Sequence, residues 1–150
     1  METFMDDKDT KILALLKEHA DYTTRQIAKK ILIPQTTIHN RIRKLTQEGV
    51  ITRFTIDVHP EKVGKAFAAY VLISANLQLL KEKKKTQYDL AEEIRRCPFV
   101  ERVDIVSGGT DLVAFIRVKD VTEFDHVLLG KLQLFEGIDK TQSLIVIHPS

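Results

Sequence analysis

The first third of the chain places hydrophobic residues at helical spacing in three short segments. Residues 6–19 carry aliphatic side chains three and four positions apart, and their first acidic residues suit the helix dipole. A Thr-Thr-Arg-Gln capping pattern at residues 23–26 predicts a short second helix. After a break at Pro34, residues 35–48 predict a third helix that Gly49 closes. Two short helices and a break before a third predict a helix-turn-helix.

The pattern becomes β-like after the third helix. A run of β-branched residues with partial alternation follows it, and Pro60 and Gly64 then interrupt the chain. The sequence therefore predicts three parts, which are a helix-turn-helix domain at residues 1–52, a β linker at 53–65 and a second domain at 66–150.

The second domain alternates between strand and helix patterns in the order β-α-β-β-α-β. Strands are expected at residues 66–75, 100–107, 112–118 and 138–148, and helices at 87–97 and from residue 122. Two β-α-β halves in this order favour an α+β fold, a ferredoxin-like sandwich with helices on one face of an antiparallel sheet. The other face needs a cover, which favours pairing with a second subunit.

Charge separates the two parts of the chain further. Residues 22–55 hold seven basic residues and one acidic residue, whereas basic and acidic residues balance from Glu61 onward. Such a basic segment is typical of a solvated face or of a nucleic-acid interface, and charge alone does not choose between them. The lysine-rich run at residues 81–85 is either a solvated loop or an extra contact for DNA or a partner.

The third predicted helix has one apolar and one polar face. At about 100° per residue, Ile38, Ile42 and Leu45 share a core stripe. The opposite face holds donors and cations, which are the groups that bond base edges and phosphates in a major groove. We expect base contacts from Thr36, His39, Asn40 and Arg43, and contacts nearer the backbone from Thr37 and Lys44. Arg41 lies at the edge of the core stripe, where it forms either a salt bridge between helices or a phosphate contact.

Several motifs follow one another in a fixed order along the chain. They are Asp6-x-x-Asp9-x-x-Ile12-Leu13, Ile38-x-x-Arg41-Ile42-x-x-Leu45-x-x-x-Gly49-Val50-Ile51, Gly64, Val100-x-x-Val103, Gly108-x-x-Asp111 and Ile138-x-x-Thr141-x-Ser143. Their order and spacing resemble the Lrp/AsnC family of leucine-responsive, or feast/famine, transcription regulators, and the resemblance covers nearly the whole chain.

The resemblance implies a winged-type helix-turn-helix followed by a ferredoxin-like domain that binds an effector and forms oligomers. Such proteins form dimers that often assemble further into tetramers or octamers, and their effectors are typically amino acids. By position, the effector contacts would be Ser107, Gly108, Gly109, Thr110, Asp111, Thr141 and Ser143. Glycines let backbone amides approach a carboxylate, and Asp111 could accept from an ammonium group. A tight β-turn, capped by Asp111, is the alternative explanation of this loop.

Three residues depart from the family pattern. Leu32 stands where the turn usually has glycine, so the turn lacks a residue that takes positive φ at low cost. Pro34 replaces the usual N-cap serine of the third helix, and Thr110 replaces an aromatic residue before Asp111. We expect DNA binding to survive the changes at Leu32 and Pro34, which would shift the helix in the groove, whereas the change at Thr110 bears on the effector.

The sequence lacks the patterns of enzymes and of metal proteins. Its five histidines show no metal-ligand spacing, and no phosphate loop or nucleophile elbow is present, so no metal, cofactor or catalytic residue is expected. Cys97 is expected to be a small buried hydrophobic residue. No apolar run approaches the length of a transmembrane helix, so no membrane partner is expected. The single cysteine favours a reducing cytoplasm, and DNA binding would place the protein at the nucleoid.

The sequence therefore predicts a sequence-specific transcription regulator that binds double-stranded DNA as a homo-oligomer and responds to a small effector. Two alternatives remain open. The first is an architectural protein that coats DNA with little sequence preference. The second is an enzyme similar to the sirohaem decarboxylases, which resemble this family in fold and length. Such an enzyme is expected to lose the basic outward face of the third helix, which is intact here.

Overall fold

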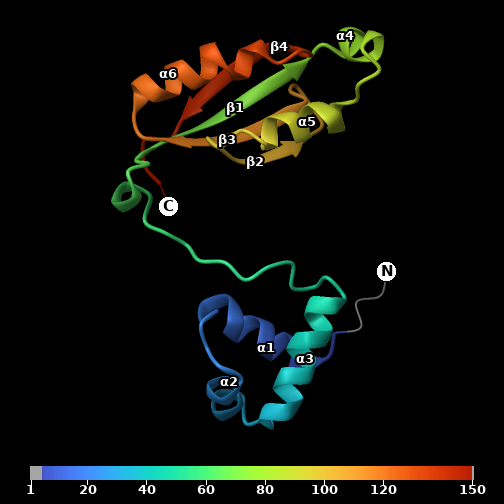
Figure 1. Ribbon diagram of the computed structural model, residues 1–150, viewed down its shortest axis with the longest axis vertical. Coiled ribbons are helices and arrows are strands. Elements are labelled where there is room, and N and C mark those ends of the chain that lie inside the picture. The colour runs from blue at the N-terminus through green and yellow to red at the C-terminus, as the bar shows by residue number, and fades with distance from the viewer. Residues whose placement is uncertain (1–4, 150) are drawn as a thin grey trace. The chain divides into compact units, whose positions relative to one another are not determined.

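The computed structural model describes residues 5–149. The chain divides into two compact units, Met1–Asp57 and Val58–Ser150. Figure 1 shows that the first is a bundle of helices and the second is a sheet with helices packed on it. The boundary between the units falls inside the segment that the sequence assigns to a linker.

The first unit contains three helices, which are α1 (Asp7–Glu18), α2 (Thr24–Ile31) and α3 (Gln35–Gln47). The first two begin with capping boxes, formed by Asp6 with Asp9 and by Thr23 with Gln26. Their apolar faces meet in a core of buried residues, which are Ile12, Leu16, Ile27 and Ile38. The predicted helix-turn-helix is confirmed.

The turn between α2 and α3 takes positive φ in spite of its leucine. Leu32 has φ +54° and ψ +45°, in the left-handed region, and its side chain is 89% exposed. The core contacts of α2 and α3 hold the turn in this conformation, which strains a residue with a Cβ by roughly 1–2 kcal/mol. Pro34 occupies the N-cap of α3 and supplies no side-chain hydrogen bond, as its substitution for serine predicts.

The β linker expected at residues 53–65 is not a strand within this chain. The structure assigns no regular element to residues 52–59, and a short 3-10 helix, η1 (Pro60–Val63), ends at Gly64. Phe54, Ile56 and Val58 are exposed. Composition favours β structure here, but a strand needs a hydrogen-bonding neighbour, and the sheet of the second unit contains four other strands.

The second unit is a four-stranded antiparallel sheet with helices. Its strands are β1 (Phe67–Ala75), β2 (Val100–Ile105), β3 (Leu112–Val118) and β4 (Ile138–Ile145), in the spatial order β2-β3-β1-β4. Its helices are α4 (Leu77–Glu82), α5 (Gln87–Arg95), α6 (Val121–Gly130) and the 3-10 turn η2 (Leu132–Leu134). The α+β, ferredoxin-like architecture is confirmed, and α4 is an addition that the sequence analysis missed.

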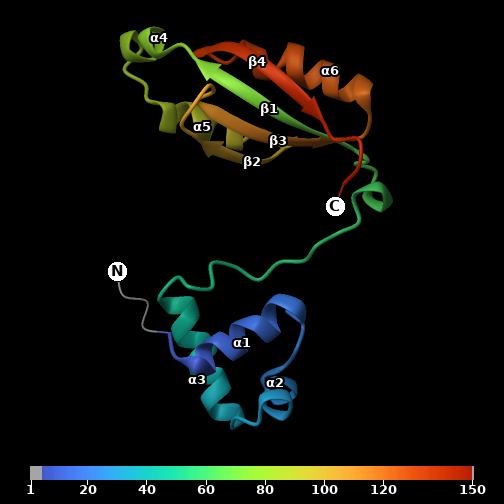
Figure 2. The same cartoon turned by 180° about the vertical axis from the view of Figure 1, so that it is seen from behind.

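Helices α5 and α6 cover one face of this sheet (Figures 1 and 2). Residues that alternate along β1 and β3, among them Val71, Ile73 and Ile116, are fully buried on that face. The opposite face, which we call the open face, carries Tyr70, whose ring packs 4.7 Å from that of Phe115. Tyr70 is 46% exposed, so residues 5–149 leave this part of the apolar face uncovered.

Candidate DNA-binding and effector sites

The third helix presents the polar face that the sequence predicts. Ile38 and Leu45 are buried in the first unit. Side chains proposed for base contact, Thr36, His39, Asn40 and Arg43, are exposed, as is Lys44, while Thr37 and Arg41 are half-buried. The side-chain amide of Gln35 donates to Thr24 Oγ1 at 3.1 Å, which joins the start of α3 to α2. The exposed face therefore holds donors and cations on a helix that is held at its start.

Charges on this face are nearly free of acidic partners. Lys44 Nζ lies 3.9 Å from Glu48 Oε1, at the limit of an ion pair, and Arg43 has no ion pair among residues 5–149. An exposed pair at this separation contributes little stability. Both cations are therefore available to an anionic ligand such as the DNA backbone.

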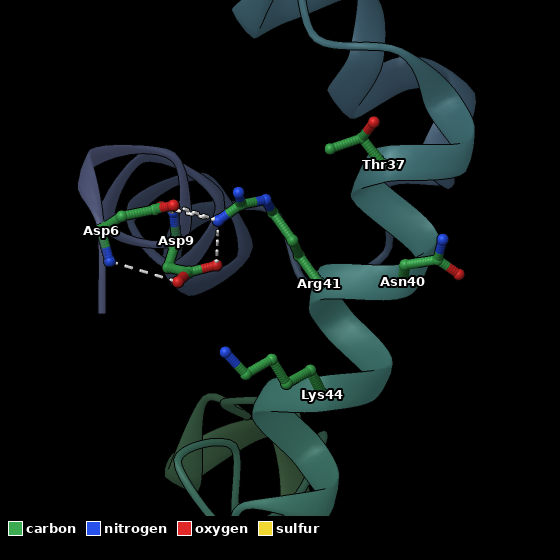
Figure 3. A pocket seen from close by; sticks show the side chains of 6 residues that line it. All are labelled: Asp6, Asp9, Thr37, Asn40, Arg41 and Lys44. Carbon is green, nitrogen blue, oxygen red and sulfur yellow. Dashed lines mark hydrogen bonds and ion pairs between the residues drawn. The ribbon is translucent and has the colours of Figure 1, made fainter. Parts of the chain in front are cut away.

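Arg41 is engaged inside the protein. Its Nη1 donates to Asp6 Oδ1 and Oδ2 at 2.6 Å and to Asp9 Oδ1 at 2.9 Å, and Figure 3 shows the side chain extending from α3 to α1. The hydrogen bond from Arg41, followed by that from the Asp9 backbone, lowers the pKa of Asp6. The same carboxylates raise the pKa of Arg41. Of the two roles considered for Arg41, the structure contains the salt bridge between helices.

A hollow of about 310 Å³ adjoins this ion pair. It is lined by Asp6, Asp9, Thr37, Asn40, Arg41 and Lys44. Figure 3 shows Arg41 extending toward α1 and Asn40 on the other side of α3, although both residues line the hollow.

Two polar side chains of the loop between β2 and β3 hold the edge of the sheet together. Asp111 Oδ2 accepts the Ala75 N–H at 2.8 Å, and its Oδ1 accepts from Gln87 Nε2 at 3.2 Å. The Thr110 hydroxyl donates to the Ile73 carbonyl at 2.9 Å. Gly108 has φ +131°, which favours glycine. The glycine of the turn is therefore in positive φ, whereas the Asp111 carboxylate, expected to cap the turn or to accept from an effector, accepts from Ala75 and Gln87 instead.

Thr141 and Ser143 lie on the helix-covered side of β4, because they pair with Ile73 and Val71 across the antiparallel register. The Thr141 hydroxyl accepts from Gln133 Nε2 at 2.7 Å. The intervening residue, Gln142, pairs with Leu72 and so lies on the open face.

A hollow of about 530 Å³ lies beside the glycine loop, and its residues from β1 and β4 belong to the open face except for Thr141. It is lined by Leu72, Ser74, Gly109, Thr110, Lys140, Thr141 and Gln142. Of the expected effector contacts, Gly109, Thr110 and Thr141 line this hollow. The other expected contacts, Ser107, Gly108, Asp111 and Ser143, do not line this hollow. The sequence analysis missed Leu72, Ser74, Lys140 and Gln142, which the two-residue alternation of β1 and β4 could have indicated.

Within residues 5–149, no three His, Cys, Asp or Glu side chains form a group suited to a metal ion. In the same residues, no helix has the length and apolar character needed to cross a bilayer. Cys97 is a free thiol at intermediate exposure, and burial raises its pKa.

The two units match two known family models. Residues 5–52 match the model for winged helix-turn-helix DNA-binding, and residues 68–149 match the model for the Lrp/AsnC ligand binding domain. The polar face of α3, joined to a ferredoxin-like domain of this kind, defines a transcription regulator with a DNA-binding part and a ligand-binding part. The chain belongs to the Lrp/AsnC family.

Similar proteins span almost the whole chain. An uncharacterised HTH-type transcriptional regulator of Pyrococcus horikoshii is 32% identical over 145 residues, which cover 97% of this chain and 94% of the relative. The regulator FL11 of Pyrococcus furiosus is 31% identical over 147 residues, with 98% and 92% covered. These relatives are named as transcription regulators, and the chain is therefore a regulator and not an enzyme of the decarboxylase type.

Solved structures share the fold. E. coli AsnC superposes with a TM-score of 0.83 at 24% identity and covers 98% of this chain and 95% of its own. A regulator of Neisseria meningitidis, solved as a complex with L-Met, gives a TM-score of 0.86 at 24% identity, with 96% and 90% covered.

Proposed function

We propose that the protein is a sequence-specific regulator that acts at the nucleoid, in which a dimer presents two copies of α3 to successive major grooves. The main support is the exposed face of α3. Asn40 and Arg43 carry side chains that can bond adenine and guanine in two places each. Both side chains are exposed, and neither has a charged partner among the described residues.

The test is a fluorescence-anisotropy titration at fixed physiological salt. It compares duplex DNA from just upstream of the protein's own gene with a scrambled duplex. We expect a preference of about 10³ or more for the upstream DNA. Equal, salt-sensitive binding to both duplexes would instead favour an architectural protein that coats DNA.

We also propose that the effector is an amino acid held in the hollow beside the glycine loop. A volume of about 530 Å³ suits a small molecule. Lys140 is exposed and has no ion pair within residues 5–149, so its ammonium group is available to a carboxylate. Because Asp111 does not line the hollow, we assign the ammonium group of the ligand to Ser74 and Gln142 instead.

Thermal-shift and calorimetric titrations with each of the twenty amino acids test this site. We expect one or a few to raise the melting temperature, and Lys140→Gln to abolish that rise. The matched control is Lys81→Gln, which removes an exposed lysine of α4 outside the hollow. A rise that survives Lys140→Gln unchanged contradicts the proposed site.

A further inference from the structure

One guanidinium nitrogen joins two helices of the DNA-binding unit. Arg41 Nη1, on α3, bonds three carboxylate oxygens of Asp6 and Asp9, at distances of 2.6, 2.6 and 2.9 Å. We call these three residues the α1–α3 ion cluster. Figure 3 shows that its two carboxylates come from the start of α1 and its cation from the middle of α3.

The cluster is built into the fold and is not a chance surface pair. Asp9 is 4% exposed and is the one buried charged residue among those described. A buried carboxylate is costly without a cation and hydrogen bonds. Asp6 and Asp9 also cap α1 reciprocally, since each accepts the backbone N–H of the other. Arg41 therefore ties α3 to groups that are already fixed at the start of α1.

Apart from the Gln35–Thr24 hydrogen bond at its start, α3 is held in the first unit mainly by apolar packing, which resists rotation about the helix axis less than directional bonds do. The stripe of Ile38, Ile42 and Leu45 is non-directional, so small rotations change its buried area little. Side-chain ends lie about 5–6 Å from a helix axis, so a roll of about 10° displaces them by about 1 Å. Hydrogen bonds to base edges do not tolerate such a displacement. A directional contact at the edge of the stripe resists the roll, and Arg41 is half-buried at that edge.

We propose that Arg41 is a positioning residue for DNA recognition: through Asp9 and Asp6 it sets the roll of α3, and hence the direction of Asn40 and Arg43. It does not contact phosphate. This inference rests on the proposed function, in which α3 contacts bases.

The two roles considered for Arg41 predict opposite effects of Asp9→Asn. If Arg41 were a phosphate contact, loss of the Asp9 charge would release it and remove an anion, so binding to any DNA would tighten. If Arg41 positions α3, the same variant lets α3 rotate more freely about its axis. The preference for upstream over scrambled DNA then falls by about tenfold, the size of one lost base contact, while the salt slope stays near that of the wild type.

The matched control is Asp7→Asn. Asp7 lies in the same first turn of α1, is exposed and has no ion pair within the described residues, so this variant makes the same charge change outside the cluster. A second variant, Asp9→Leu with Arg41→Met, replaces the pair by apolar groups, which often fill the place of a buried ion pair. We expect it to restore most of the preference, although Arg41 has lost its charge.

Anisotropy titrations of the full chain over a salt series provide the first readout, after circular dichroism has shown each variant to be folded. Residual dipolar couplings of the free protein provide the second, because they report the orientation of α3 relative to α1 without DNA. We expect a reorientation in Asp9→Asn, none in Asp7→Asn, and recovery in the double variant.

Binding to both duplexes that is tighter in Asp9→Asn than in Asp7→Asn, or an unchanged orientation of α3, would overturn the inference. A salt slope lowered by about one in the double variant would also overturn it, since that is the mark of a lost phosphate contact. If the wild type shows no DNA preference, the proposed function fails, and the dipolar couplings still decide whether the cluster sets the roll of α3.

Discussion

Arg43 and Lys44 are neighbours on α3, and both are exposed cations, yet we predict different roles for them. Arg43→Ala should cost roughly 1–3 kcal/mol and relax the preference at one base pair, because a guanidinium bonds guanine in two places. Lys44→Ala should weaken binding to all sequences alike and lower the salt slope by about one. Anisotropy titrations against single-base variants of the upstream DNA separate the two. Equal losses with unchanged base preference would contradict this division of roles.

Leu32 is held in a conformation that glycine adopts at lower cost. Its φ of +54° is imposed by the turn, and its side chain is 89% exposed, so Leu32→Gly removes strain without opening a cavity. We expect the free energy of unfolding to rise by about 0.5–1 kcal/mol, the balance of relieved strain and the larger chain entropy of glycine. Urea denaturation measures the change. Leu32→Ala keeps the Cβ and should give no comparable gain, and a loss of stability in Leu32→Gly would contradict the account.

Asp6 makes the free energy of unfolding of the first unit depend on pH in the acidic range. Its hydrogen bond from Arg41 holds its pKa below the ordinary value of 3.8 in the folded protein. A lowered pKa in the folded state adds stability that is present above 3.8 and is lost as the pH falls through the folded value. We expect Asp6→Asn to be less stable than the wild type at neutral pH and the difference to shrink as the pH falls below 3.8. Urea denaturation across this range checks it, with Asp7→Asn as the variant expected to show no such convergence.

At the scale of elements, the loop between β2 and β3 joins the end of β1 to the start of α5 through hydrogen bonds. Asp111 bonds the Ala75 N–H and the Gln87 side chain, which lie at the end of β1 and the start of α5. We expect Asp111→Ala to lower the free energy of unfolding by about 1–3 kcal/mol, because it leaves the Ala75 donor unpaired. Thermal unfolding measures this loss. Asp139→Ala, at an exposed position of β4 with no ion pair in the described chain, should change it little.

Element boundaries show which signals a sequence carries. Thr23 and Gln26 marked the start of α2, and the strand expected at 112–118 agrees with β3 at both ends, because capping and two-residue alternation are local signals. Helix α4 was missed, since its six residues merge into a lysine-rich run that is typical of a loop. Its buried Leu80 is set by contact with the sheet domain, which no local pattern encodes.

At the scale of the whole molecule, the open face of the sheet favours a homodimer. Tyr70 and Leu144 are each 46% exposed there and pair across β1 and β4. We propose that a second copy covers this face, and that the linker at 53–65 becomes β structure by pairing with a second copy. Light scattering should therefore give at least a dimer for the wild type.

Leu144→Glu should shift the protein toward the monomer, because a carboxylate would be buried against an apolar surface. Light scattering after size-exclusion chromatography measures the shift. Tyr88→Glu, an equally drastic change at a 78% exposed position of α5, is the control. A Leu144→Glu protein with the wild-type mass would contradict dimerisation through the open face.

The sequence by itself determined most of the helices and strands and their order, apart from α4 and the linker, and it determined the polar face of α3. These follow from caps, periodicity and charge, which act between residues close along the chain. Tertiary structure decided what the polar side chains do. It bound Arg41 to Asp6 and Asp9, occupied Asp111 within the sheet, and brought Lys140 beside the glycine loop. These hydrogen bonds join residues more than 25 positions apart in the sequence. Local sequence patterns do not indicate which distant groups will lie within about 3 Å of one another in the folded chain.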